Sequence, residues 1–342
     1  MNIQKNIDLT DFNTFKVSIT ADYYAEISSE RDLEDILDFT STEKIPFHIL
    51  GGGSNILFVK DFQGMIIHVK NRGILWDENT DSEKERVDVS AGEDWHNFVI
   101  SSLNKKFYGL ENLALIPGTV GGAPIQNIGA YGVEVKDLIK SVKVFDVIER
   151  KWLTLSNQDC GFNYRNSIFR TSDRYIVYSV VFELTRQWKP KLHHKELYEK
   201  FHCKTIGALD VFNEVCRIRS TKIPDPKIKG NAGSFFKNPF ISISELNRLT
   251  SEFPKIPFYN TNDPDIVKVP AAWLLDNLGW KGKNFGGAFV SSDHALVIVN
   301  QGNATGEQIY NLARQMSSSV FDKYGITLVP EVKIIDSQSN FN

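Results

Sequence analysis

The sequence has few cysteines, no long apolar run and almost no excess of charge. Its 342 residues include three cysteines, an odd number without a C-x-x-C pair, which argues against a disulfide framework and favours a reducing compartment. No uninterrupted apolar run approaches the ~20 residues that span a bilayer, and the first residues lack the basic stretch and apolar core of a secretory signal. We therefore expect a cytoplasmic protein without membrane insertion.

The sequence also lacks an excess of charge of one sign and a set of residues spaced as metal ligands. The 39 lysines and arginines stand against 42 acidic residues, a net charge of −3, which argues against a nucleic-acid partner. His193 and His194 are adjacent and point apart, with no third ligand spaced for them, so we expect no metal site. The hydrophobic share of 42% is typical of folded globular proteins, and the length favours roughly two domains. The composition gives no indication of a protein partner.

Glycine is gathered in clusters, of which the first is Gly51–Asn55. It separates an apolar strand predicted over 47–50 from a second strand predicted over 56–59. A strand after the glycines argues against the dinucleotide fingerprint, in which a helix follows them. The consecutive N–H groups of such a turn can bind an anion, although a hairpin without a ligand is the simpler interpretation of these glycines alone.

The second cluster lies within residues 109–132. Five glycines fall between positions 118 and 132, in a stretch that is poor in charge and not repetitive, unlike an ordinary linker. Because glycine removes side-chain bulk, we interpret this stretch as backbone that approaches a ligand closely.

Capping patterns and apolar periodicity predict several elements. Ser29 followed by Asp32 predicts a helix within a β-α-β unit, and Thr305 with Gln308 predicts a second helix near the C-terminus. Strands are expected over 23–27, 87–92, 142–147, 175–184 and 326–335.

Two further segments carry groups that suit an active site. Arg165 stands between aromatic residues and can bind a carboxylate with its planar guanidinium, or stack on Tyr164. The stretch 230–239 (GNAGSFFKNP) places a hydroxyl, an amide and an amine beside small residues. Ser234 by itself would be interpreted as a hydroxyl that stabilises a turn.

Five motifs occur in a fixed order along nearly the whole chain. They are GGGSN at 51–55, GLENLALIPGTVGGAPIQNIGAYG at 109–132, YRNSIF at 164–169, GNAGSFFKNP at 230–239 and PEV at 330–332. With this series the chain resembles the UDP-N-acetylenolpyruvoylglucosamine reductase family in its longer, type I form. The resemblance implies an α+β fold, with an FAD-binding part of the vanillyl-alcohol-oxidase (PCMH) type and a smaller α+β substrate-binding domain. The implied division is FAD-binding subdomain 1 over 1–70, completed by a C-terminal strand over 326–342, FAD-binding subdomain 2 over 71–223, and the substrate-binding domain over 224–325.

The resemblance also implies an FAD-containing, NADPH-dependent oxidoreductase of peptidoglycan precursor synthesis. Such an enzyme reduces UDP-N-acetylglucosamine enolpyruvate to UDP-N-acetylmuramate, so this nucleotide and NADPH are the expected small-molecule partners. Reduced flavin gives hydride to the enolpyruvyl methylene, and Ser234 gives a proton to the adjacent carbon. Arg165 is expected to stabilise the substrate carboxylate, and Glu331 is expected to be the third catalytic residue.

The matching motif positions imply contacts to noncovalent FAD and to the nucleotide. Expected FAD contacts are Gly51, Gly52, Gly53, Ser54, Asn55, Ile116, Pro117, Gly118, Thr119, Gly121, Gly122, Gln126, Asn127 and Gly129. Expected substrate contacts are Tyr164, His194, Lys222, Asn238 and His294. His194 stands where related enzymes of the longer form carry a tyrosine that closes over the diphosphate, so we expect closure here to depend on pH.

Two other functions stay open at this stage. One is a flavin-dependent oxidase of the same fold, in which Ser234, Arg165 and Glu331 would lose their common purpose. The other is a noncatalytic nucleotide-binding flavoprotein, against which the presence of all three catalytic residue types argues.

Overall fold

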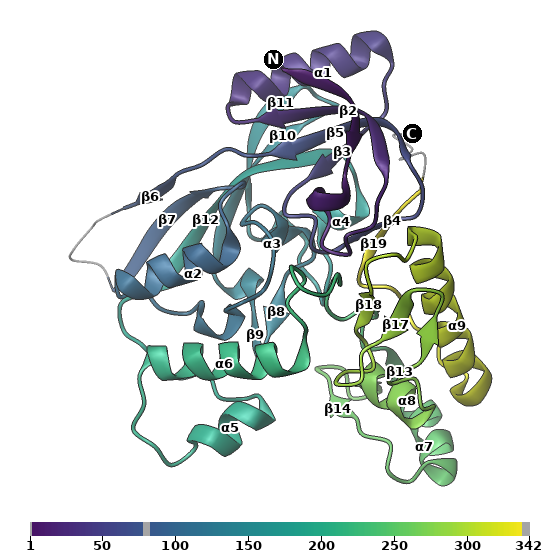
Figure 1. Cartoon of the computed structure of the whole chain (residues 1–342). Coiled ribbons are helices and arrows are strands. Elements are labelled where there is room, and N and C mark those ends of the chain that lie inside the picture. The colour runs from purple at the N-terminus through teal and green to yellow at the C-terminus, as the bar shows by residue number, and fades with distance from the viewer. Residues whose placement is uncertain (1, 78–82, 337–342) are drawn as a thin grey trace.

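The computed structural model describes residues 2–77 and 83–336 of the chain. Residues 1 and 337–342, which the predicted first subdomain includes, lie outside the described residues. Figure 1 shows the N-terminal strands at one end of the molecule, helices α5 and α6 at the other end, and the C-terminal elements beside both.

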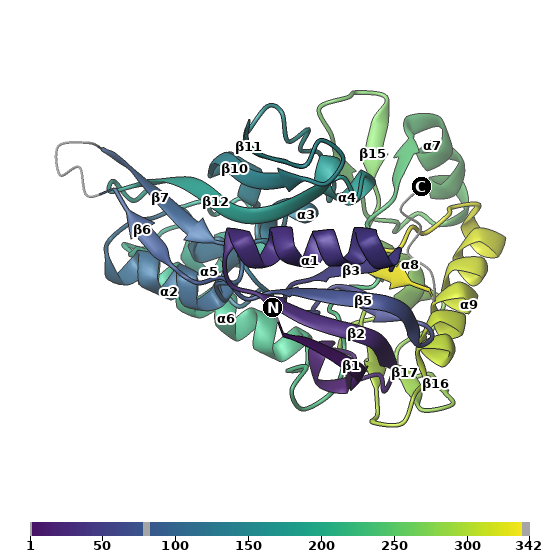
Figure 2. The same cartoon turned by 90° about the horizontal axis from the view of Figure 1, so that it is seen from above.

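The N-terminal sheet carries the predicted β-α-β unit, and that prediction is confirmed. Its strands run in the order β1-β2-β5-β3, with β2 and β3 both parallel to β5. Ser29 and Asp32 form a complete capping box at the start of the helix, whose buried face includes Leu33 and Ile36. Figure 2 shows this helix lying across the sheet. The bounds are β1 Ile3–Asp8, β2 Thr20–Ile27, α1 Glu30–Glu43, β3 Phe47–Leu50, β4 Ile56–Phe58 and β5 Phe62–Val69.

A second, antiparallel sheet forms the middle of the chain. Its order is β11-β10-β12-β7-β6, so the strands predicted over 87–92, 142–147 and 175–184 all belong to it. Helix α2 packs against it through Trp95 and Phe98, whose rings both contact Phe182 of β12. The bounds are β6 Ile74–Trp76, β7 Lys84–Ser90, α2 Trp95–Asn104, β10 Ile139–Asp146, β11 Lys151–Ser156 and β12 Tyr175–Thr185.

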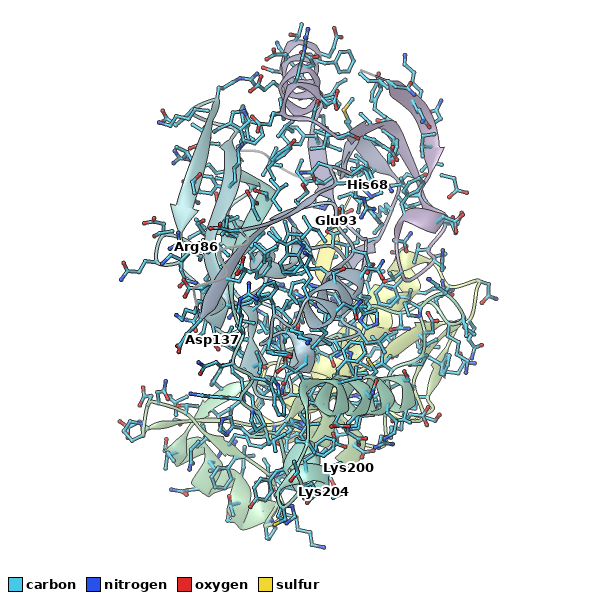
Figure 3. The ribbon with its side chains drawn as sticks, turned by 90° about the vertical axis from the view of Figure 1, so that its left-hand side faces the viewer. His68, Arg86, Glu93, Asp137, Lys200 and Lys204 are labelled. Carbon is cyan, nitrogen blue, oxygen red and sulfur yellow. The ribbon has the colours of Figure 1, made fainter. Side chains whose placement is uncertain are left out.

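Two helices, α5 (Lys195–Phe201) and α6 (Ala208–Lys222), follow the second sheet. Helix α6 was not predicted from the sequence, although Val211, Val215 and Ile218 are buried along one face at helical spacing. In Figure 3, Lys200 on α5 and the nearby Lys204 lie at the opposite end of the molecule from His68 on β5.

The C-terminal part shares a hydrophobic core with the N-terminal sheet. Phe15 and Leu50 belong to the same buried cluster as Phe235 and Met316. Strand β19 (Lys333–Ile335) pairs in parallel with β4, so a C-terminal strand joins an N-terminal one. The described strand covers only 333–335 of the predicted 326–335, because Pro330 has no N–H for a ladder and pairs only as an isolated bridge. The domain bounds stay a prediction.

The remaining elements are short, apart from the long helix α9, whose predicted capping box at Thr305 and Gln308 is confirmed. The C-terminal bounds are β13 Phe240–Ser242, α7 Ile243–Glu252, β14 Tyr259–Asn260, β15 Ile266–Lys268, α8 Ala271–Asn277, β16 Asn284–Phe285, β17 Ala288–Val290, β18 Ile298–Asn300, α9 Gly306–Tyr324 and β19 Lys333–Ile335. The single turns and short pairs are η1 Thr10–Phe12, η2 Glu111–Leu113, α3 Gly122–Ile125, β8 Gly129–Ala130, β9 Val133–Glu134, η3 Val135–Asp137 and α4 Ile168–Thr171.

Candidate active site

A large cleft lies between the two sheets and encloses about 1350 Å³ of space, including its open mouth. The turn Gly51–Asn55 forms one wall of this cleft. It joins β3, which pairs with β5, to β4, which pairs with β19, so the turn connects two sheets. The hairpin interpretation of these glycines is therefore wrong.

Two glycine-containing loops meet in the cleft. The Ser54 hydroxyl donates to the Pro117 carbonyl at 2.9 Å. A Cβ on Gly52 would lie 2.7 Å from the Gly118 Cα, and a Cβ on Gly118 would lie 2.7 Å from the Ser54 Oγ. Glycine at these two positions is what allows the loops to touch.

Several backbone N–H groups of these loops donate no hydrogen bond to any described residue. Among the backbone hydrogen bonds of the described residues, none is donated by positions 51–55, 118 or 119. Consecutive N–H groups of this kind make an anion-binding concavity, and a diphosphate matches it. The other walls are mainly apolar, with Val69, Ala91 and Val177 among their residues, which suits a flat ring system.

Of the predicted FAD contacts, all but Asn127 and Gly129 line the cleft within the described residues. The side chain of Asn127 is fully engaged inside the protein: it donates to the Glu134 carboxylate and the Asn163 carbonyl and accepts from the Lys136 N–H. Its position is therefore structural. The Gly129 carbonyl instead accepts a hydrogen bond from the Arg165 guanidinium.

Arg165 and Glu331 form an ion pair next to the main chain that lines the cleft. Arg165 Nε lies 3.0 Å from Glu331 Oε1, and their side chains are 18% and 17% exposed. The Glu331 N–H donates to the carbonyl of Phe235 at 2.7 Å, so the residue after Ser234 is held against Glu331. The fold thus gathers the three predicted catalytic residues from distant parts of the chain.

A hydrogen-bonded network fixes the main chain of Glu331 to the cleft. Arg170 donates to the Glu331 carbonyl at 2.8 Å, and the Asn55 amide donates to the same oxygen at 3.0 Å. Gln126 Oε1 accepts from both Arg170 and Asn55. Arg170 was not among the site residues predicted from the sequence. The only sequence signal for it is a cation that directly follows the apolar residues Ile168 and Phe169.

The Ser234 hydroxyl makes no hydrogen bond among those of the described residues. The Ser234 backbone forms an isolated bridge with Val297. The neighbouring Phe235 N–H donates to the Leu296 carbonyl at 2.8 Å. The backbone at Ser234 is therefore held in place, while the hydroxyl oxygen of this half-buried residue has no hydrogen bond within the described structure.

A second pocket brings together three of the predicted substrate contacts, His194, Lys222 and His294. Arg219 also lines this pocket. It stands three residues before Lys222 on α6, and residues three apart share a helix face, so its position could have been predicted from the sequence. Burial lowers the pKa of His194 and of His294 below the usual range. Lys222 and Arg219 supply two cations here, which suits an anionic ligand.

Of the other two predicted substrate contacts, Tyr164 lies beside Arg165, and Asn238 has its backbone close to the Tyr164 hydroxyl. The Tyr164 ring has the Arg165 guanidinium 5.4 Å and the Lys268 ammonium 5.0 Å from its centroid. Asn238 Oδ1 accepts from the Ala271 N–H at 3.0 Å and thus holds the start of α8. The amide nitrogen of Asn238 donates no hydrogen bond among those of the described residues and can donate to a ligand.

The described residues include neither a membrane-spanning helix nor a cluster of metal ligands. No helix among them is long and apolar enough to cross a bilayer. No group of three or more metal-ligating side chains occurs in the part of the chain that the structure describes.

Comparisons with known proteins match both parts of the chain. The C-terminal domain profile of UDP-N-acetylenolpyruvoylglucosamine reductase matches residues 225–335, and an FAD binding domain profile matches residues 21–149. This FAD-binding match bears out the predicted α+β flavoprotein fold.

Curated relatives match over almost their full length. A UDP-N-acetylenolpyruvoylglucosamine reductase of Flavobacterium johnsoniae is 40% identical, over 98% of this chain and 100% of that one. One of Shewanella oneidensis is 44% identical, over 96% and 95%. The crystal structure of UDP-N-acetylenolpyruvylglucosamine reductase from Thermus caldophilus aligns with a TM-score of 0.68 at 23% identity, covering 98% of this chain and 99% of that one, and therefore has the same fold.

Proposed function

The chain belongs to the UDP-N-acetylenolpyruvoylglucosamine reductase family, and we propose that it catalyses that family's reaction. It reduces UDP-N-acetylglucosamine enolpyruvate to UDP-N-acetylmuramate in peptidoglycan precursor synthesis, with bound FAD as cofactor and NADPH as reductant. The observation that carries the proposal is the Arg165–Glu331 pair, tied through Arg170 and Asn55 to a cleft with free backbone N–H groups.

The residues of the cleft fit FAD. The unengaged N–H groups at 51–55 and 118–119 would hold its diphosphate, and the apolar walls would hold its ring systems. When bound, FAD is the two-electron carrier between NADPH and the enolpyruvyl group. The protein binds and orients the cofactor and the substrate, because the redox chemistry belongs to the cofactor.

Arg165 stabilises the charge that develops on the substrate. Hydride addition to the enolpyruvyl methylene leaves negative charge on the adjacent carbon and its carboxylate, and a planar guanidinium can bind that carboxylate through two N–H groups. Glu331 orients the guanidinium from 3.0 Å away, and the Gly129 carbonyl accepts from its other side. The cation is therefore held in place before the substrate arrives, which removes a reorganisation cost from the reaction.

Ser234 donates the proton to the adjacent carbon. Serine is a weak acid, so it serves only a strongly basic acceptor such as the enolate carbon. Its hydroxyl has no partner among the described residues, and the Phe235 carbonyl beside it accepts from the Glu331 N–H. The proton donor and the charge-stabilising pair thus stand on neighbouring main-chain segments.

The nucleotide diphosphate binds in the second pocket. Lys222 and Arg219 offer cations, and His294 stands at the start of the turn that leads to Val297, the backbone partner of Ser234. A nucleotide anchored there extends its sugar and enolpyruvyl group toward Ser234. Tyr164, beside Arg165, and the Asn238 amide nitrogen are then contacts for the sugar or enolpyruvyl part.

Replacing Ser234 by alanine tests the proposal. We expect Ser234→Ala to bind FAD and to be reduced by NADPH at the wild-type rate, because the hydroxyl does not line the cleft. Turnover of UDP-N-acetylglucosamine enolpyruvate should fall by about 10²- to 10⁴-fold, the usual contribution of a positioned acid.

The matched control is Ser251→Ala, which removes an exposed hydroxyl that donates to the Arg248 carbonyl on helix α7 and lines neither pocket. Stopped-flow absorbance separates the two half-reactions. Unchanged turnover in Ser234→Ala would remove serine from the mechanism.

A further inference from the structure

The second pocket contains one carboxylate, and that carboxylate occupies the lysine on which the nucleotide diphosphate is proposed to bind. Lys222 Nζ lies 2.7 Å from both carboxylate oxygens of Glu196. Arg219 instead donates to the Leu115 carbonyl at 3.2 Å. A diphosphate that enters the pocket therefore meets a cation already neutralised and a negative charge beside it.

From this contact we infer that Glu196 competes with the diphosphate of the nucleotide for Lys222 and so sets the affinity of the pocket. The inference rests on the proposed function, because it takes the ligand to be the nucleotide substrate. Glu196 repels the phosphates while it holds Lys222, and it must give up Lys222 before the ligand can form its own ion pair.

The surrounding residues allow Glu196 to change partners without refolding. Glu196 is the second residue of α5 and Lys222 the last residue of α6, so both stand at helix ends with long side chains. His194 Nδ1 lies 3.9 Å from Glu196 Oε2 and has no hydrogen-bond partner within the described structure. It offers Glu196 an alternative contact once Lys222 turns to the ligand.

The pair contributes little to the stability of the fold. The Lys222 and Glu196 side chains are 41% and 36% exposed, and exposed ion pairs are weak because water and salt screen them. Neutralising Glu196 should therefore leave the protein folded. A contact that adds little to folding but blocks a binding cation acts mainly on the ligand.

The test is the affinity of the FAD-loaded enzyme for UDP, measured by isothermal titration calorimetry. We expect Glu196→Gln to bind UDP roughly five- to tenfold more tightly than the wild type, because the glutamine keeps the shape and removes the competing charge. The Michaelis constant for the nucleotide substrate should fall in the same direction.

Glu199→Gln is the matched control. Glu199 is on the same helix and pairs with Lys195 at 3.8 Å, with a side chain that is 62% exposed, so its removal changes the net charge equally without touching the pocket. Its UDP affinity should equal that of the wild type. An equal gain in both variants would attribute the effect to net charge and overturn the inference.

Two other outcomes would also be decisive. If Glu196→Gln bound UDP as the wild type does, or more weakly, Glu196 would be a residue that positions Lys222, and the competition would be disproved. If neither the wild type nor Glu196→Gln bound UDP while both retained FAD, the proposed function would fail and the inference with it.

Discussion

Arg170 ties the position of Glu331 to the wall of the FAD cleft. Its guanidinium donates to the Glu331 carbonyl and to Gln126 Oε1, and burial lowers its pKa from the usual value. Sequence reasoning reached Arg165, Ser234 and Glu331 only through the family motifs, because none of these residue types is distinctive alone. It missed Arg170 because the role depends on two carbonyl oxygens from residues 330 and 331, which the chain brings close only when folded.

At the same scale, His194 gives a pH dependence whose sign follows from its surroundings. Burial lowers the pKa of His194, while Glu196 raises it and Lys222 lowers it further, so the ring is neutral at pH 7 and becomes charged only below its usual range. Because His194 does not titrate in that range, we expect it to contribute no change in the Michaelis constant for the nucleotide substrate between about pH 7 and 9. It should decrease on acidification, as an imidazolium forms beside the phosphates.

The comparison is the same pH profile of His194→Tyr, in which a phenol stays neutral over the range. An acidic decrease that persists unchanged in His194→Tyr would rule out His194 as its source.

At the scale of elements, the turn 51–55 and the loop around residue 118 act as one unit. Gly118 has φ +125°, a conformation that is strained for other residues, and its Cβ would meet the Ser54 hydroxyl. We expect Gly118→Ala to cost about 1–3 kcal/mol from backbone strain alone and to weaken FAD binding, because the loops must separate. Flavin fluorescence titration of the apoprotein measures the affinity.

Gly302→Ala is the control for backbone strain. Gly302 has φ +107°, does not line the cleft, and a Cβ there would have no described atom within 4 Å. It should bind FAD nearly as the wild type does. Equal affinities for both variants would show that the contact between the loops does not matter for the cofactor.

Elements with local signals were the ones that sequence alone could predict. The capping boxes at Ser29 and Thr305 and the strand 47–50 are in place because local hydrogen bonds and apolar periodicity determine them. The sheets to which β3 and β4 belong could not be predicted, because β4 pairs with β19 some 280 residues later. The C-terminal strand is shorter than predicted because Pro330 interrupts the ladder, whereas the apolar pattern of 326–335 alone indicated one continuous strand.

At the scale of the whole molecule, the two pockets are joined through one C-terminal segment. The chain from His294 to Val297 connects the second pocket to Ser234, and the Phe235 carbonyl connects Ser234 to Glu331. A common core of N-terminal and C-terminal residues holds these parts together. In the binding mode we propose, one nucleotide occupies the second pocket while its enolpyruvyl group lies at the Arg165–Glu331 pair.

The most direct test of this arrangement is an anaerobic half-reaction. The protein is loaded with FAD, reduced with NADPH, and mixed with UDP-N-acetylglucosamine enolpyruvate while the absorbance of oxidised flavin is followed. We predict rapid return of the oxidised spectrum, in proportion to the nucleotide added. A flavin that stays reduced with the nucleotide and is reoxidised only by air would contradict the proposed reaction and indicate an oxidase.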